Sequence, residues 1–280
     1  MGEKLGQNFL VNKNIAEKIV EAANLSPGDL VLEIGPGKGI LTEELAKKAG
    51  KVIAVEIDGN LVEILENKFK GNGKIEIINE NILKILNSKS EILNENKNLK
   101  LKNLELIENL KFKIENSPYK IVANLPYYIT SPIIRMFLES KNSPTEMILM
   151  VQKEVAERIA ASPGKMSVLA VSVQYYAQPK ILFNVPREAF NPIPKVDSAV
   201  ISIKALKHKN IKTIEEVRKF FRVVRAGFCA KRKTLVNNLS NSFHLDKKTV
   251  EEKLKLIGIS SRARAQELSV EDWKKLAELF

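Results

Sequence analysis

The segment Asn124-Leu125-Pro126-Tyr127 combines groups that suit the binding of a flat nitrogenous base. It follows the short apolar run 119–123, which predicts a buried strand, so the motif stands where a strand ends and a loop begins. An amide can donate and accept hydrogen bonds, a proline restricts the chain, and an aromatic ring can stack on a base. The alternative is a turn whose tyrosine packs in the core, as most aromatic residues do. A second aromatic, Tyr128, has no assigned role.

A glycine-rich turn follows the first short apolar run of the chain. Its glycines, which would let a ligand approach the backbone closely, are Gly35, Gly37 and Gly39. The next apolar run ends at Glu56, whose carboxylate can accept hydrogen bonds from both hydroxyls of a ribose. The alternative for Glu56 is a solvated strand end. The dinucleotide fingerprint needs its third glycine where this chain has Ile40, which disfavours binding of NAD.

These motifs require elements that bring their ends together. Short apolar runs alternate with helical periodicity through the first two thirds of the chain, which predicts a parallel α/β sheet. Strands are expected at 30–34, 51–56, 74–79, 119–123, 146–151, 180–185 and 198–206. From residue 214 onward the pattern is helical without a strand signal. We therefore expect a Rossmann-like α/β domain over 1–207 and a small all-α domain over 208–280.

Residues 87–117 interrupt this alternation. The stretch is rich in Asn, Lys, Glu and Leu and contains neither glycine nor proline, so it is interpreted as a low-complexity insertion. Leu110, Phe112 and Ile114 alternate with polar residues, which favours a strand near its end.

The composition narrows the class of protein. Among 280 residues, 44% are hydrophobic, which suffices for a sizeable core, and the formal net charge of +12 favours nucleic acid as a partner. An anionic membrane is the competing partner, but no apolar run approaches the roughly 18–20 residues of a membrane helix. Cys229 is the only cysteine, and His208 and His244 are far apart, so neither a disulfide nor a metal site is expected. We expect a cytoplasmic protein that binds no membrane.

Three further motifs make the chain similar to one particular family of proteins. Residues 6–10 read Gly-Gln-Asn-Phe-Leu, residues 191–198 read Asn-Pro-Ile-Pro-Lys-Val-Asp-Ser, and residues 228–235 form a basic segment. With the glycine turn, Glu56 and the Asn124 motif, the chain resembles the bacterial 16S ribosomal RNA adenine dimethyltransferases over nearly its whole length except the insertion. The resemblance implies a Rossmann-like methyltransferase sheet, S-adenosyl-L-methionine as cofactor and a monomer. It also implies dimethylation of two adjacent adenines in the 3′-terminal hairpin loop of 16S rRNA, within the small ribosomal subunit, during ribosome biogenesis.

The resemblance also implies roles for single residues. Asn8 and Leu10 would close over the cofactor, and Glu56 would hold its ribose. Gly35 would lie against the amino-acid moiety of the cofactor, and Gly37 would also contact the cofactor. Where the family has an aspartate that accepts from the adenine amine of the cofactor, this chain has Asn81, whose amide oxygen could still accept.

Asn124 would touch both the cofactor and the target base. Its side-chain oxygen and the Leu125 carbonyl would accept the two hydrogens of an adenine amine. The resemblance implies that Tyr127 stacks on this base and that Phe190 clamps its other face. RNA phosphates would bind the basic residues of the C-terminal domain, namely Arg222, Arg225, Lys231, Arg232 and Lys233, with Arg262 and Arg264 as a second patch. A merely solvated face is the alternative for these charges.

Two other functions remain open at this point. The related 23S rRNA adenine methyltransferases, which confer macrolide resistance, share the cofactor fold and the Asn-x-Pro-aromatic motif. A non-enzymatic assembly or transcription factor on the same fold is the other possibility, because a fold does not determine a function.

Overall fold

The computed structural model describes residues 8–87, 108, 110, 114, 116–126, 129–140, 142–206 and 213–280. By their contacts the residues form two compact units, Met1–Ala156 with Lys180–Ala205 and Glu157–Pro179 with Leu206–Phe280. The first unit contains most of the sheet, and the second is mainly helical. Within the described residues, no helix is long and apolar enough to cross a membrane.

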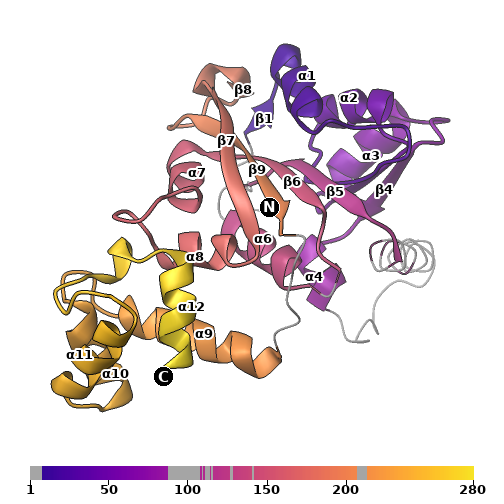
Figure 1. Cartoon of the computed structure of the whole chain (residues 1–280). Coiled ribbons are helices and arrows are strands. Elements are labelled where there is room, and N and C mark those ends of the chain that lie inside the picture. The colour runs from indigo at the N-terminus through magenta and orange to yellow at the C-terminus, as the bar shows by residue number, and fades with distance from the viewer. Residues whose placement is uncertain are drawn as a thin grey trace. The chain divides into compact units, whose positions relative to one another are not determined.

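The central sheet has seven strands in the order β4-β3-β2-β5-β6-β9-β7 (Figure 1). Strands β4 to β6 are parallel, and β9 pairs antiparallel with β6. The strand bounds are β2 Leu30–Ile34, β3 Lys51–Glu56, β4 Ile75–Asn79, β5 Tyr119–Asn124, β6 Glu146–Gln152, β7 Ala177–Val185 and β9 Ser198–Ala205. This agrees with the predicted α/β class and with a strand at each predicted position.

Helices cover both faces of the sheet, which is why its central strands are nearly continuous apolar runs. On one face, α1 and α2 pack in a single hydrophobic cluster with Val31, Val122 and Val200. On the other, the Tyr119 ring of β5 contacts the Phe137 ring of α6 with centroids 6.5 Å apart. The helices of this unit are α1 Lys13–Ala22, α2 Ile40–Lys48, α3 Gly59–Lys68, α4 Ile82–Asn87 and α6 Thr130–Glu139, and α7 Lys153–Ile159 runs into the second unit.

A two-residue strand pair lies apart from the main sheet. Strand β1 (Phe9–Leu10) pairs antiparallel with β8 (Phe190–Asn191), so that Leu10 faces Phe190. The sequence did not predict this pair, because two residues are too few for an alternating pattern. It joins the N-terminal segment to the start of the segment 191–198 and thereby places both next to the carboxyl ends of the parallel strands.

The helical unit is built around one hydrophobic cluster that includes the fully buried Trp273. Its helices are α8 Val168–Gln174, α9 Ile214–Gly227, α10 Leu235–Phe243, α11 Lys247–Leu256 and α12 Val270–Glu278. Helix α8 belongs to this cluster, where the ring of Tyr175, after the C-terminus of α8, packs against the ring of Phe220 of α9 with centroids 4.3 Å apart. Segment 157–179 therefore packs with the helical unit. The expected boundary near residue 207 instead divided the chain at a single point and left this segment in the first domain. The assignment of separate catalytic and RNA-binding domains stays a prediction.

The strand expected near residue 114 is wrong. Glu108, Leu110, Ile114 and Asn116, the described residues of this part of the insertion, have helical backbone. Leu110 and Ile114 are 0% and 5% exposed, and four residues correspond to about one helical turn. Leu110 and Ile114 are four residues apart, a spacing that occurs both on one face of a strand and on one face of a helix. The apolar positions alone therefore could not distinguish a strand from a helix. The rest of the insertion lies outside the described residues.

Candidate active site

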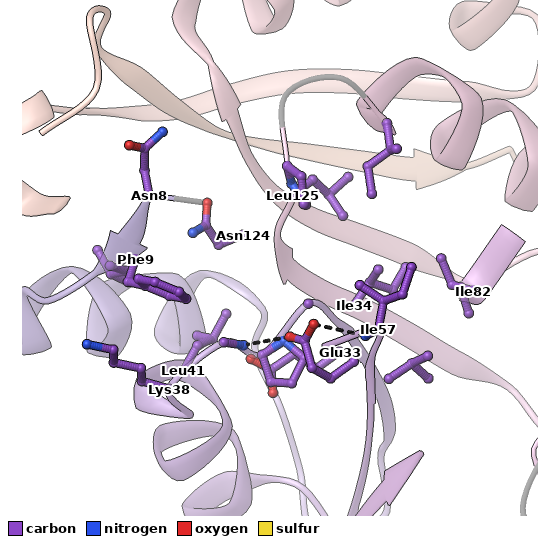
Figure 2. A pocket seen from close by; sticks show the side chains of 18 of the residues that line it. Asn8, Phe9, Glu33, Ile34, Lys38, Leu41, Ile57, Ile82, Asn124 and Leu125 are labelled. Atoms are coloured by element: carbon purple, nitrogen blue, oxygen red, sulfur yellow. Dashed lines mark hydrogen bonds between the residues drawn. The ribbon is translucent and has the colours of Figure 1, made fainter. Parts of the chain in front are cut away.

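A cavity of about 580 Å³ opens at the carboxyl ends of the parallel strands. Figure 2 shows Asn8, Phe9 and Lys38 on one side of it and Ile57 and Ile82 on the other. Ligands of open α/β sheets bind at this edge because the loops that follow the strands meet there. The lining includes nine of the residues singled out in the sequence: Asn8, Leu10, Gly35, Gly37, Glu56, Asn81, Asn124, Leu125 and Phe190.

The glycine turn is shaped by the backbone and by one aromatic ring. Gly35 has a φ of 67°, in the left-handed region, and a Cβ there would meet only Pro126 Cδ at 3.8 Å. Gly37 has a φ of 57°, and its Cβ would lie 3.0 Å from Phe9 Cδ1. The Nζ of Lys38 lies 5.2 Å from the centroid of the same ring. Phe9 therefore couples the N-terminal strand to the turn, a contact that the sequence did not indicate.

Glu56 stands at the end of β3 with 3% of its surface exposed. Its Oε1 accepts from the backbone N–H groups of Ile57 (2.9 Å) and Asp58 (3.0 Å), and its Oε2 accepts from Gly37 N–H (3.2 Å). These bonds fix the carboxylate against the glycine turn. A carboxylate offers about four acceptor positions, so Oε2 can still receive a donor from the cavity.

Glu33 is a cavity residue that the sequence reasoning missed. It lies within β2 and is only 1% exposed, and its Oε2 has no hydrogen-bond partner among the described residues. Burial raises the pKa of this carboxyl to about 8, and the charge of Glu56 adds to the rise, whereas Thr42 and Lys68 oppose it. The signal was present in the sequence as an acidic residue inside an otherwise apolar run, Leu-Val-Leu-Glu-Ile.

The end of β5 enters the cavity through Asn124 and Leu125. Leu125 is 1% exposed, and its N–H donates to Met150 O at 3.1 Å, which continues the pairing with β6. The Pro126 carbonyl accepts from Ile129 N–H, which closes the turn. Among the described residues, neither the Asn124 side chain nor the Leu125 carbonyl has a hydrogen-bond partner. Tyr127 and Tyr128 lie outside the described residues, so the expected stacking of Tyr127 stays a prediction.

Phe190 lines the cavity from β8 but is only 2% exposed and belongs to the hydrophobic cluster that includes α1 and α2. Leu10, its partner in the β1–β8 pair, is 6% exposed and belongs to the same cluster. Both residues therefore contribute to packing as well as to the cavity wall. Whether Phe190 also clamps a base stays a prediction.

The predicted RNA-binding residues lie on the helical unit. Arg222 and Arg225 are exposed on α9, whose opposite face buries Phe220 and Val224. None of the cations proposed for RNA binding forms an ion pair with another described residue, and all are exposed: Arg222, Arg225, Lys231, Arg232 and Lys233. The backbone of Leu235 donates to Ala263 O at 2.8 Å, which brings Arg262 and Arg264 next to the segment 231–233. Two patches that are separate in the sequence thus become neighbours.

Comparisons with known proteins give matches over nearly the whole chain. The family model of the ribosomal RNA adenine dimethylases matches residues 2–280. The chain is 44% identical to "Ribosomal RNA small subunit methyltransferase A" of Dehalococcoides mccartyi, over 97% of this chain and 86% of that protein. It is 40% identical to the protein of the same name in Fusobacterium nucleatum, over 99% and 97%.

Two solved structures share the fold over nearly the whole chain. The 23S rRNA methyltransferase ErmE has a TM-score of 0.71 and 27% identity, and the alignment covers 97% of this chain and 99% of that one. A dimethyladenosine transferase from Plasmodium falciparum has a TM-score of 0.71 and 25% identity, with 96% and 95% covered. The similarity therefore extends through both compact units.

Proposed function

Since the chain belongs to the ribosomal RNA adenine dimethylase family, we propose that it dimethylates two adjacent adenines in the 3′-terminal hairpin loop of 16S rRNA. The enzyme is an S-adenosylmethionine-dependent methyltransferase that acts on adenine of ribosomal RNA. The small subunit as substrate is our proposal, supported by the names of relatives at 39–44% identity. We also propose that it acts as a monomer in the cytoplasm, where ribosomal subunits are assembled.

The residues of the cavity fit this cofactor. S-adenosylmethionine carries a sulfonium and an ammonium cation against one carboxylate, and it supplies an electrophilic methyl group when bound. Three acidic side chains, Glu33, Glu56 and Glu80, line the cavity, and Lys38 is the only basic residue in the described lining. The unpartnered Oε2 of Glu33 is a buried polar atom with which a bound ligand could form a hydrogen bond. In our proposal Glu56 holds the ribose and Gly35 admits the amino-acid moiety.

The observation that carries the function is the convergence of the β5 end on this cavity. The Asn124 amide and the Leu125 carbonyl have no partner among the described residues and can accept the two hydrogens of an adenine amine. Acceptance of both hydrogens favours a pyramidal nitrogen whose lone pair points toward the methyl donor. The cofactor, held by Glu56 and Gly35 in our proposal, would supply the methyl group and keep the electron pair of the broken bond on its sulfur, and the surplus proton of the amine would leave to water. Positioning supplies most of the rate, because the sulfonium is already a good leaving group.

Substitution of Asn124 tests this assignment. Asn124→Ala removes one of the two acceptors, so we expect methyl incorporation into unmethylated small subunits to fall by about 100-fold or more, the loss seen for a single positioned transition-state group. Cofactor affinity, measured by calorimetry, should change much less. Asn67→Ala, an exposed position on α3, is the matched control. Near wild-type dimethylation by the Asn124 variant would contradict the role assigned to this residue.

The same assay separates the small subunit from the rival target. The similarity to ErmE makes methylation of 23S rRNA the second candidate. We expect the modified bases, mapped after reaction with both subunits, to lie in 16S rRNA only.

Tyr127→Ala should lose more activity than Tyr127→Phe if the ring stacks on the target base.

The basic surface is proposed to bind rRNA phosphates. Neutralising Lys231, Arg232 and Lys233 to Gln should weaken association with the small subunit and reduce its dependence on salt, by a logarithmic slope of about 0.7–0.9 for each lost phosphate contact. A matched variant that neutralises three exposed lysines of α11, Lys247, Lys248 and Lys255, removes the same charge elsewhere. An equal effect of both variants would point to net charge instead of a specific surface.

A further inference from the structure

The cavity has an apolar end beyond Glu56. Ile57 and Ile82 lie together on this side (Figure 2), and Ile57 is 51% exposed although it lines a cavity. A large exposed apolar side chain in a cavity wall favours a ligand with a flat apolar face, because contact removes its surface from water. If Glu56 holds the ribose, the adenine of the cofactor is the part that reaches these two side chains. The polar edge of the purine then faces Asn81, the residue before Ile82.

The side chain of Asn81 is fixed by the start of α4. Its Oδ1 accepts from the backbone N–H of Leu83 at 3.0 Å, and the backbone N–H of Asn81 donates to Glu80 Oε1 at 2.7 Å. Since a backbone N–H must meet an oxygen and not an NH₂ group, this bond sets the orientation of the amide. The Nδ2 group is then the remaining polar atom of the side chain, and it has no hydrogen-bond partner among the described residues. Because Asn81 lines the cavity, this NH₂ group is available to donate to an acceptor on a bound ligand.

We propose that Asn81 selects the adenine of the cofactor by donating a hydrogen bond from Nδ2 to the ring nitrogen N1. The inference rests on the proposed placement of S-adenosylmethionine in this cavity. A carboxylate at this position would use one oxygen for Leu83 N–H and offer the other as an acceptor to the adenine amine. In Asn81 the second atom is Nδ2, a donor. The adenine amine is also a donor and cannot pair with it, whereas the ring nitrogen N1 can accept from it. The hydrogen bond thus runs in the opposite direction to the one that the family resemblance implies.

Two analogues of S-adenosylhomocysteine separate these arrangements at single atoms. In the 1-deaza analogue a C–H replaces N1, and in the purine analogue a hydrogen replaces the 6-amino group. For the wild-type protein we expect the 1-deaza analogue to bind roughly tenfold more weakly than S-adenosylhomocysteine in calorimetry, because Nδ2 loses its acceptor. In Asn81→Asp this penalty should disappear, and loss of the 6-amino group should become more costly than in the wild type.

The combination of variant and analogue isolates the contact of Asn81 from other groups near N1. An equal 1-deaza penalty in the wild type and in Asn81→Asp would overturn the inference, because the donor would then lie elsewhere. Equal binding of the 1-deaza analogue and S-adenosylhomocysteine by the wild type would also overturn it. Asn67→Asp, the same substitution on the exposed face of α3, controls for the added charge. Failure of the wild type to bind S-adenosylhomocysteine would instead refute the placement of the cofactor.

Discussion

Replacement of Glu33 by glutamine should change how stability depends on pH. The carboxyl is 1% exposed and has a pKa of about 8, against 4.5 for an ordinary glutamate, chiefly because burial disfavours its charge. Between these values the native state holds a proton that the unfolded chain releases. The free energy of unfolding must therefore fall as the pH rises from about 4.5 through 8. Glutamine keeps the shape of the side chain but has no proton to lose.

The expected magnitude follows from the shift. At about 1.4 kcal/mol per pKa unit, a rise from 4.5 to about 8 corresponds to on the order of 5 kcal/mol when the carboxyl is ionised fully. Between pH 5 and pH 8, the linkage relation gives a change of about 3 kcal/mol in the stability difference between wild type and Glu33→Gln. The wild type should lose stability relative to the variant over this range.

Urea denaturation of the cofactor-free protein at several pH values measures this difference. Other groups also titrate, so the quantity of interest is the difference between wild type and Glu33→Gln at each pH, not either curve alone. Glu63→Gln, an exposed glutamate of α3, is the matched control for the same chemical change. If the difference in the free energy of unfolding between wild type and Glu33→Gln stays constant within about 1 kcal/mol from pH 5 to pH 8, Glu33 is not a buried neutral carboxyl.

Two glycines should be intolerant of a methyl group for different reasons. Gly39→Ala should cost about 2 kcal/mol in urea denaturation, since its φ is 76° and the new Cβ would lie 2.8 Å from the buried Leu65. Gly227→Ala should cost a similar amount, because its Cβ would lie 2.3 Å from the fully buried ring of Trp273, and the change should appear in the fluorescence of that tryptophan. Gly73→Ala, where a Cβ would meet nothing within 4 Å, should be nearly neutral, and comparable losses at all three positions would show that the packing argument is wrong.

The sequence by itself was enough to predict the class of fold and nine residues of the cavity lining. Apolar runs report buried strands directly, and residues at the ends of parallel strands must meet at one edge of the sheet. That is why the sequence predicts that Gly35, Glu56 and Asn124, which are far apart in the chain, lie together.

The tertiary structure decided what depends on contacts between distant segments. Burial of Glu33 beneath the glycine turn raises its pKa, and no local pattern reports how much water remains around a side chain. The β1–β8 pair holds Phe9 against Gly37. Each of these strands has only two residues, which is too few to give a pattern in the sequence. The direction of the Asn81 amide depends on a hydrogen bond to Leu83. The residue types therefore determined which groups are available for chemistry, whereas long-range packing determined their protonation, orientation and free hydrogen-bonding positions.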